Sequence, residues 1–330
     1  MNRETIAKIV KASGVSAGEL VLVHFWGEDA DKEIANNFVA SVAALGATPF
    51  LLQQARSINQ TIFSTAKETC FDDRYFDLFS KFDAVLDVFA YQPIVLGGKI
   101  EEEQMVLYRK YISQLFYKLM ECTRFTQIRI PTVANAAESN LDPQEYIQRM
   151  TKAFDIDYPE VDLACKREVE RFSGVTKVVV HSGIDCALYF DITDRAWHVD
   201  SGNGDLPCGE IYIAPIEDKS CGNVFFETFY LDDVKYNNVT LQISDGEVSG
   251  SSNKDVEEHF AKLSKEDRMV CELGLGMNPN VKDLCGYTVL DEKMMGTFHI
   301  AVGTNTMFGG KNEASNHIDF VGCGKVEVIL

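Results

Sequence analysis

The segment Leu20-Val-Leu-Val-His-Phe25 opens the stretch that decides the fold. It is a short apolar run typical of a buried strand, and a polar stretch separates it from apolar residues that recur at helical spacing. Those residues are Ile34, Phe38, Val42 and Leu45. Gly46 lies where a helix C-terminal cap is expected, and Pro49-Phe-Leu-Leu52 resumes an extended run. This order predicts a βαβ unit, in which two parallel strands are joined by a covering helix.

The alternation of strand and helix continues beyond this unit. Apolar runs predict strands over Phe82–Phe89 and Ile128–Val133, with a long helix over Glu101–Cys122 between them. Asp142-Pro143 has the N-cap acid and first-turn proline of a helix start, and a further helix is expected after Pro159. We therefore predict an α/β protein whose N-terminal domain, residues 1–150, is a parallel sheet covered by helices.

From Thr176 onward, the sequence changes to short apolar runs separated by Gly, Asp and Asn. The predicted strands are Lys177–His181, Ala187–Ile192, Trp197–Asp200, Ile211–Ala214 and Val224–Leu231, with a hairpin at Asp245-Gly246. Residues 151–330 are thus expected to form a strand-rich α+β domain.

The composition is that of an ordinary globular protein: of 330 residues, 46% are hydrophobic and 25% are charged, and the formal net charge is -19. Negative charge repels phosphate backbones and anionic lipids, so no nucleic-acid or membrane partner is expected. No apolar run is long enough for a membrane span or a signal sequence, which predicts a cytoplasmic protein. The nine cysteines are scattered without a C-x-x-C pair, and we expect them to be reduced and mostly buried.

The glycine-rich motifs that bind nucleotides are missing from the N-terminal half. No Gly-x-Gly-x-x-Gly follows a predicted strand, and no Walker A lysine motif occurs. The N-terminal domain is therefore expected to act as a scaffold or lid.

Two of the six histidines lie in settings that suggest metal binding. His299 is in the alternating apolar run Gly296–Gly303, and His317 precedes Asp319 by two residues. Residues i and i+2 of an extended segment point to one face, so His317 and Asp319 can hold one ion together. The remaining histidines are interpreted as structural, hydrogen-bonded residues: His24, His181, His198 and His259.

Two glutamates are embedded in apolar surroundings. Glu210 immediately precedes the apolar run Ile211–Ala214, and Glu272 lies within Met269–Gly276. A buried carboxylate is unfavourable unless it is paired or bound to metal. Glu210 and Glu272 are therefore candidate ligands, although exposure at a sheet edge would account equally well for either one alone.

Four segments, in this order, resemble the motif series of the thermophilic metalloaminopeptidases, the family of aminopeptidase T and aminopeptidase S. They are Leu-Pro-Cys-Gly-Glu-Ile-Tyr-Ile-Ala-Pro (206–215), Glu-Leu-Gly-Leu-Gly-Met-Asn-Pro (272–279), Asp-Glu-Lys-Met-Met-Gly-Thr-Phe-His-Ile-Ala-Val-Gly (291–303) and Gly-Gly-Lys-Asn-Glu-Ala-Ser-Asn-His-Ile-Asp (309–319). The resemblance covers residues 180–325, with a looser fit in the N-terminal half. The chain is identified as a short, divergent member.

The resemblance implies two divalent ions held by five side chains: Glu210, Glu272, His299, His317 and Asp319. Three carboxylates and a bridging hydroxide would balance about four positive charges, and imidazole with carboxylate ligands suits zinc, cobalt or manganese. The implied reaction is hydrolysis of the first peptide bond of short peptides by a metal-activated water. The family also implies a homodimer whose subunits restrict access to the site.

The chain departs from the family pattern at two positions. Two successive glutamates usually form the first ligand motif, one of them serving as general base, whereas here the pair is Gly209-Glu210. Thr306 occupies the position of a family tyrosine that would bind metal or stabilise the oxyanion. Glu210 and Thr306 are the catalytic candidates. Groups that could replace the missing ones, unless they are surface or structural residues, are Glu217, Glu292, Lys293 and Lys311.

Two other enzyme classes stay open. Ring-cleaving dihydroxypyridine dioxygenases resemble the same family, and His299, His317 and Asp319 would suit the two-histidine, one-carboxylate triad of non-haem Fe(II) oxygenases. A mononuclear iron site would not need Glu210 and Glu272, so their retention favours the hydrolase. The same dinuclear site could also hydrolyse a small non-peptide amide or lactam.

Overall fold

The computed structural model describes residues 1–93 and 100–329 and divides into two compact units. Unit 1 comprises Met1–Asp155 and Gly202–Pro207, and unit 2 comprises Ile156–Ser201 and Cys208–Leu330. In the described part of the chain, no helix is long and apolar enough to cross a membrane.

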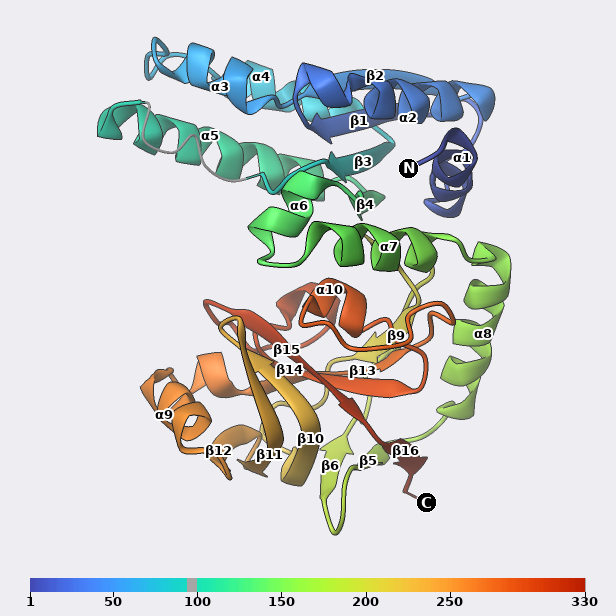
Figure 1. The fold of residues 1–330 in the computed structure, drawn as a ribbon, viewed down its shortest axis with the longest axis vertical. Coiled ribbons are helices and arrows are strands. Elements are labelled where there is room, and N and C mark those ends of the chain that lie inside the picture. The colour runs from blue at the N-terminus through green and yellow to red at the C-terminus, as the bar shows by residue number, and fades with distance from the viewer. Residues whose placement is uncertain (94–99, 330) are drawn as a thin grey trace. The chain divides into compact units, whose positions relative to one another are not determined.

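Unit 1 contains one parallel sheet of five strands in the order β2-β1-β3-β4-β8. Figure 1 labels all of these strands except β8. The strands are β1 (Leu20–Trp26), β2 (Thr48–Gln53), β3 (Ala84–Phe89), β4 (Phe125–Arg129) and β8 (Asp205–Leu206). From β1 the chain proceeds to β2 on one side and later to β3 on the other. The order of the strands therefore reverses between β1 and β3.

Helices cover this sheet. They are α1 (Arg3–Ala12), α2 (Lys32–Ala44), α3 (Arg56–Phe63), α4 (Asp73–Asp77), α5 (Glu102–Met120), α6 (Val133–Glu138) and α7 (Pro143–Phe154), with 3-10 turns η1 (Asp29–Asp31) and η2 (Leu78–Lys81). Leu22 and Val85 on the sheet pack in one buried cluster with Phe63 of α3 and with Tyr111 and Leu115 of α5. The β1 face that carries Leu22 is thus the face beneath α5.

One predicted strand is displaced. The prediction over Ile128–Val133 is wrong, because β4 runs from Phe125 to Arg129. Pro131 has no N–H to continue a ladder, and the side chain of Thr132 caps α6 by accepting from the backbone N–H of Asn135. The predicted mixed α/β fold class is nevertheless confirmed.

Unit 2 contains two antiparallel sheets, β12-β11-β10-β6-β5-β16 and β15-β14-β13-β9-β7. Figure 1 labels all of their strands except β7. Their strands are β5 (Lys177–His181), β6 (Ala187–Asp191), β7 (His198–Asp200), β9 (Glu210–Ile213), β10 (Cys221–Leu231), β11 (Val234–Ser244), β12 (Glu247–Ser251), β13 (Val270–Gly276), β14 (Thr297–Gly303), β15 (His317–Cys323) and β16 (Lys325–Val328). The helices are α8 (Tyr158–Arg171), α9 (Lys254–Lys262) and α10 (Thr288–Asp291), with 3-10 turns η3 (Glu266–Arg268) and η4 (Thr306–Phe308).

Phenylalanine side chains join the two sheets of unit 2 into one core. Phe226 and Phe229 of β10 meet Phe298 of β14 and Phe320 of β15, with the Phe229 and Phe320 rings stacked 4.7 Å apart. The predicted hairpin at Asp245-Gly246 is confirmed: both residues have positive φ, as a tight two-residue turn between β11 and β12 requires. The second sheet of unit 2 therefore packs on the first through these rings.

All nine cysteines are free, but the prediction that most are buried is wrong. Those buried are Cys165, Cys208 and Cys271. The exposed ones are Cys70, Cys221 and Cys323, and Cys122, Cys186 and Cys285 are half-buried.

Candidate metal centre

The residues predicted to bind metal all lie on one face of the sheet β15-β14-β13-β9-β7. They are Glu210 on β9, Glu272 on β13, His299 on β14, and His317 and Asp319 on β15. Residues directly opposite each other in an antiparallel pair point to the same face. Ala301 is opposite both Glu272 and Asp319, and His299 is opposite Gly274. Strand pairing alone therefore brings these distant segments of sequence together.

Two local features of β13 direct the side chains. The register of β13 against β14 shifts between Val270 and Glu272, so Cys271 forms a β-bulge. Without this extra residue, the side chains on one side of the bulge would point to the opposite face. A Cβ on Gly274 would overlap the ring of His299, so only glycine leaves room for that imidazole.

Glu272 lies at the centre of the cluster and contacts both imidazoles. Its Oε1 is 3.2 Å from Nε2 of His299, and its Oε2 is 3.5 Å from Nε2 of His317. The His317 nitrogen is also 3.5 Å from Oδ2 of Asp319, and the His299 nitrogen is 3.5 Å from Oε2 of Glu210. The side chains thus form one continuous series, and Glu272, His317 and Asp319 place potential ligand atoms within 4.8 Å of one another.

Lys293 adds one buried positive charge to this cluster. Its side chain is 1% exposed, and Nζ lies 2.5 Å from Oε1 of Glu210 and 2.8 Å from Oε1 of Glu292. Asp200 is at 4.0 Å from the same ammonium. The ammonium compensates the acidic groups at the Glu210 end, whereas the two imidazoles compensate those at the other end.

The environment shifts the pKa values of the cluster. Burial raises the pKa of Glu210 to about 8, although the charge of Lys293 opposes this shift. Burial by itself lowers the pKa of His299, but the contact with Glu272 and the charge of Glu210 outweigh it and raise that pKa to about 9. At His317, burial is likewise outweighed by the hydrogen bond with Asp319, which raises the pKa well above its ordinary range. The metal-free cluster therefore holds protons at neutral pH that a bound cation must displace.

Thr306, the predicted catalytic residue at the family tyrosine position, lies on η4 and is exposed. Among the described residues, its hydroxyl has no hydrogen bond to the acidic cluster. A phenol is instead present at Tyr212, which is two residues after Glu210 on β9 and so shares its face. Burial, reinforced by the charges of Glu210 and Glu272, raises the pKa of Tyr212, so the phenol stays neutral and can donate a hydrogen bond.

Tyr212 is one of a row of aromatic rings beside the acidic cluster, together with His198, Phe308 and His317. Its ring stacks on His198 with centroids 5.2 Å apart and meets the edge of Phe308 at 5.4 Å. Phe308 in turn lies 6.0 Å from the ring of His317. His198 Nε2 is 3.1 Å from the backbone oxygen of Phe308. This contact agrees with the interpretation of His198 as a structural, hydrogen-bonded residue.

The candidate replacements for the missing catalytic groups separate into two pairs. Glu292 and Lys293 belong to the acidic cluster, as described above. Glu217 accepts from the Arg195 guanidinium at 2.8 Å and from the backbone N–H of Lys311 at 2.6 Å. These hydrogen bonds hold the loop that follows η4. The structural interpretation therefore holds for Glu217.

The donor set fits a cation of the zinc, cobalt or manganese type. Imidazole nitrogens and carboxylate oxygens are the ligands these ions take. Oε2 of Glu210 is buried and has no hydrogen-bond partner among the described residues. A buried oxygen without a donor is unfavourable, and a bound cation would satisfy it.

The sequence interpretation named Lys293 only as a possible replacement for a missing catalytic group, and it did not identify Asp200 or Tyr212. Lys293 lies within the third motif but outside the alternating strand, and the loop after α10 carries it into the cluster. Asp200 is opposite Glu210 in the pairing of β7 with β9. The spacing of Tyr212 from Glu210, two residues along a predicted strand, was a signal that could have identified this phenol.

Comparisons with known proteins give a family and a fold. Residues 4–325 match the family model described as thermophilic metalloprotease (M29). Among solved structures, wild-type AmpT from Thermus thermophilus is similar, with a TM-score of 0.68 at 16% identity over 99% of this chain and 98% of that chain. The 2,5-dihydroxypyridine dioxygenase of Pseudomonas putida KT2440 is also similar, with a TM-score of 0.64 at 13% identity over 99% of this chain and 93% of the other. No curated protein matches the chain.

Proposed function

Since the chain belongs to the thermophilic metalloprotease (M29) family, it is a metal-dependent hydrolase, and we propose that it is an aminopeptidase that releases N-terminal amino acids from short peptides. The observation that carries this proposal is the position of Glu272, which offers one carboxylate oxygen toward each imidazole. A carboxylate placed in this way suits two neighbouring cations that share one ligand.

We assign the ligands by their positions around Glu272. Glu210 and His299 would hold one divalent ion with Glu272, and His317 and Asp319 would hold the second. Zinc, cobalt and manganese are the candidate metals. Such ions would supply polarisation of the scissile carbonyl and a water acidified toward neutrality.

The chain's own groups would position the substrate. Lys293 fixes Oε1 of Glu210 and so leaves Oε2 directed at the cluster. Glu292 and Asp200, together with Glu210, outnumber the single Lys293 ammonium, and the net negative charge that they leave would attract the α-ammonium group of a peptide. Tyr212 would donate to the oxyanion in place of the family tyrosine, while Thr306, at that tyrosine's sequence position, is the weaker proposal because it is exposed.

A metal-reconstitution assay tests this function. Chelated protein reloaded with zinc, cobalt or manganese should hydrolyse amino-acid anilides and dipeptides but not their N-acetylated forms, which lack the ammonium group. The variant H317A should be inactive, and E257Q, which changes an exposed carboxylate on α9, should behave as wild type. Loss of turnover on every substrate with all three metals would refute the proposal.

The ring-cleaving dioxygenase is the second candidate. The similarity in fold to the Pseudomonas enzyme favours it, whereas the grouping of Glu272, His317 and Asp319 does not, because it has one histidine where the Fe(II) triad has two. The alternative triad of His299, His317 and Asp319 contains Fe(II)-type ligands from the same face. Elemental analysis separates the candidates: nearly two divalent ions per chain favour the hydrolase, and a single iron with dioxygen uptake favours the oxygenase.

Two further proposals concern substrate and assembly. If linear peptides are poor substrates, cyclic amides assayed with the same metals would identify a hydrolase of small non-peptide amides. We also propose a homodimer, by analogy with the family, and light scattering coupled to size exclusion tests it; a strictly monomeric profile would contradict it.

A further inference from the structure

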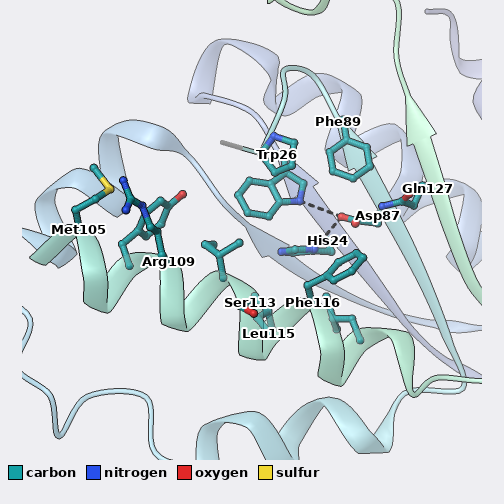
Figure 2. Close-up of a pocket in the computed structure, with 14 residues that line it drawn as sticks. His24, Trp26, Asp87, Phe89, Met105, Arg109, Ser113, Leu115, Phe116 and Gln127 are labelled. Atoms are coloured by element: carbon teal, nitrogen blue, oxygen red, sulfur yellow. Dashed lines mark hydrogen bonds and ion pairs between the residues drawn. The ribbon is translucent and has the colours of Figure 1, made fainter. Parts of the chain in front are cut away.

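Unit 1 contains a cavity of about 510 Å³ between its sheet and α5 (Figure 2). Its lining comes from β1, β3, β4 and α5 and from Pro93, and none of these residues belongs to the candidate metal centre. The volume is within the range of pockets that bind small molecules, roughly 300–1,000 Å³. The role of scaffold or lid expected for this unit gives no reason for such a cavity.

The cavity lies at the place where an open parallel sheet most often binds ligands. The strand order reverses between β1 and β3, and the residues at their carboxyl ends, Trp26 and Phe89, both line the cavity. Loops diverge from such a switch point and leave a crevice there. Topology therefore points to this cavity independently of its side chains.

A buried polar pair lies on its sheet side. His24 and Asp87 are 2% and 3% exposed, and Nδ1 of His24 lies 2.9 Å from Oδ1 of Asp87 (Figure 2). The indole N–H of Trp26 donates to the same oxygen at 3.0 Å. Pairing with Asp87 agrees with a structural interpretation of His24. It does not explain why a histidine and an acid occupy two central strands of a parallel sheet, where apolar residues are the rule.

Both ring nitrogens of His24 are buried without a hydrogen bond of good geometry among the described residues. Nδ1 keeps the 2.9 Å contact with Asp87, so Nε2 is the nitrogen left unexplained. Because a carboxylate cannot donate, the proton of a neutral ring resides on Nδ1, beside Asp87, and Nε2 keeps a lone pair. A buried acceptor without a donor is unfavourable unless a ligand or water satisfies it.

Most of the remaining lining is apolar, with four aromatic side chains among aliphatic ones, and Arg109, Ser113 and Gln127 add polar groups. The rings of Trp26 and Phe89 are within 14° of parallel, with centroids 6.5 Å apart. Tyr108 and Phe116 contribute further aromatic surface from α5. Flat apolar surfaces of this kind favour an aromatic ring.

We propose that this cavity binds a flat aromatic molecule that carries a hydroxyl group, which donates a hydrogen bond to Nε2 of His24. The rings supply the apolar contact, and His24 selects the hydroxyl. Asp87 is a positioning residue, since it fixes which nitrogen of the imidazole accepts.

The test uses 2-naphthol and 2-methoxynaphthalene, which share the fused rings, but the ether carries a methyl group in place of the proton that naphthol can donate. The variant H24N, described below, separates the loss of the donor from the size of that methyl group. The chain has two tryptophans, so the variant W197F leaves Trp26 in the cavity as the single indole reporter. In this background, 2-naphthol should change Trp26 fluorescence saturably with one site per chain, confirmed by calorimetry. The methyl ether should bind on the order of tenfold or more weakly, since it leaves the buried acceptor unpaired.

Two variants complete the design. H24N keeps an amide N–H for Asp87 but removes the Nε2 acceptor, so both probes should bind with equal affinity. I112W fills the cavity from α5 without altering the His24 and Asp87 pair, and should abolish binding of both probes while the thermal unfolding transition is retained. Absence of saturable 2-naphthol binding, equal affinities of the wild-type site for the two probes, or unchanged binding in I112W would each overturn the proposal.

Discussion

Replacing Glu272 by glutamine tests the proposed metal centre most directly. The change preserves volume at a side chain that is 9% exposed, but removes the charge that lies 3.2 Å from His299 and 3.5 Å from His317. At an effective dielectric constant of about 20, a unit charge at these distances is worth about 5 kcal/mol. A divalent ion carries more charge than an imidazolium, so it should depend on Glu272 at least as strongly.

We allow half of this energy for solvent screening and structural relaxation. Each ion should then lose about 2.5 kcal/mol of binding free energy. This corresponds to roughly 50- to 100-fold weaker binding of each ion. E272Q should therefore lose both ions on dialysis against micromolar metal, whereas D319N should lose only one. Turnover on amino-acid anilides should fall in E272Q by at least the same factor.

The assay combines elemental analysis with thermal unfolding. Zinc should raise the unfolding temperature of the wild type and of the control E257Q, because it binds only the folded state, but should leave that of E272Q unchanged. The reasoning is refuted if E272Q keeps two ions per chain, or if it loses one ion and D319N loses both.

Three further predictions follow from the same cluster. K293M leaves the Glu210 carboxylate buried without its ammonium. It should lower the free energy of unfolding of the metal-free protein, measured by urea titration, by about 3–5 kcal/mol, and a loss below about 1 kcal/mol would contradict the pairing. G274A places a methyl group against the ring of His299, and should cost about 1–3 kcal/mol and weaken metal binding; unchanged affinity would show that the ring can move freely. The pKa of His299 is raised to about 9 and that of Glu210 to about 8, so metal binding at pH 7 should release protons and weaken as the pH falls. Calorimetry in buffers of different ionisation enthalpy should detect the released protons. Binding heats that do not depend on the buffer would contradict this prediction.

The strands were predictable where hydrophobic runs had clear ends. The run at Leu20 and the Asp245-Gly246 turn carry local signals, and the structure confirms both. The strand near Ile128 was placed too far along the chain, because the apolar character of the sequence continues through Pro131, where the ladder stops. Boundaries depend on hydrogen bonds and caps that an apolar pattern does not contain.

In the candidate centre, local spacing likewise predicted some contacts between side chains and could not predict others. His317 and Asp319 could be paired from their spacing alone, since both lie on one strand. The meeting of Glu210 with Lys293 could not be predicted from spacing, because a loop of irregular conformation delivers the lysine to a strand far away in sequence. Contacts of this kind depend on tertiary structure and leave no periodic signal.

The bulge at Cys271 has an evolutionary consequence. Each strand of the centre alternates between two faces, so gain or loss of one residue inside β9, β13, β14 or β15 would rotate every side chain beyond that point away from its partners. Substitutions can adjust such a centre gradually, but length changes cannot. Among descendants of this gene that keep the same chemistry, insertions and deletions should therefore accumulate in the connecting loops, while the four strand lengths and the single extra residue are inherited unchanged.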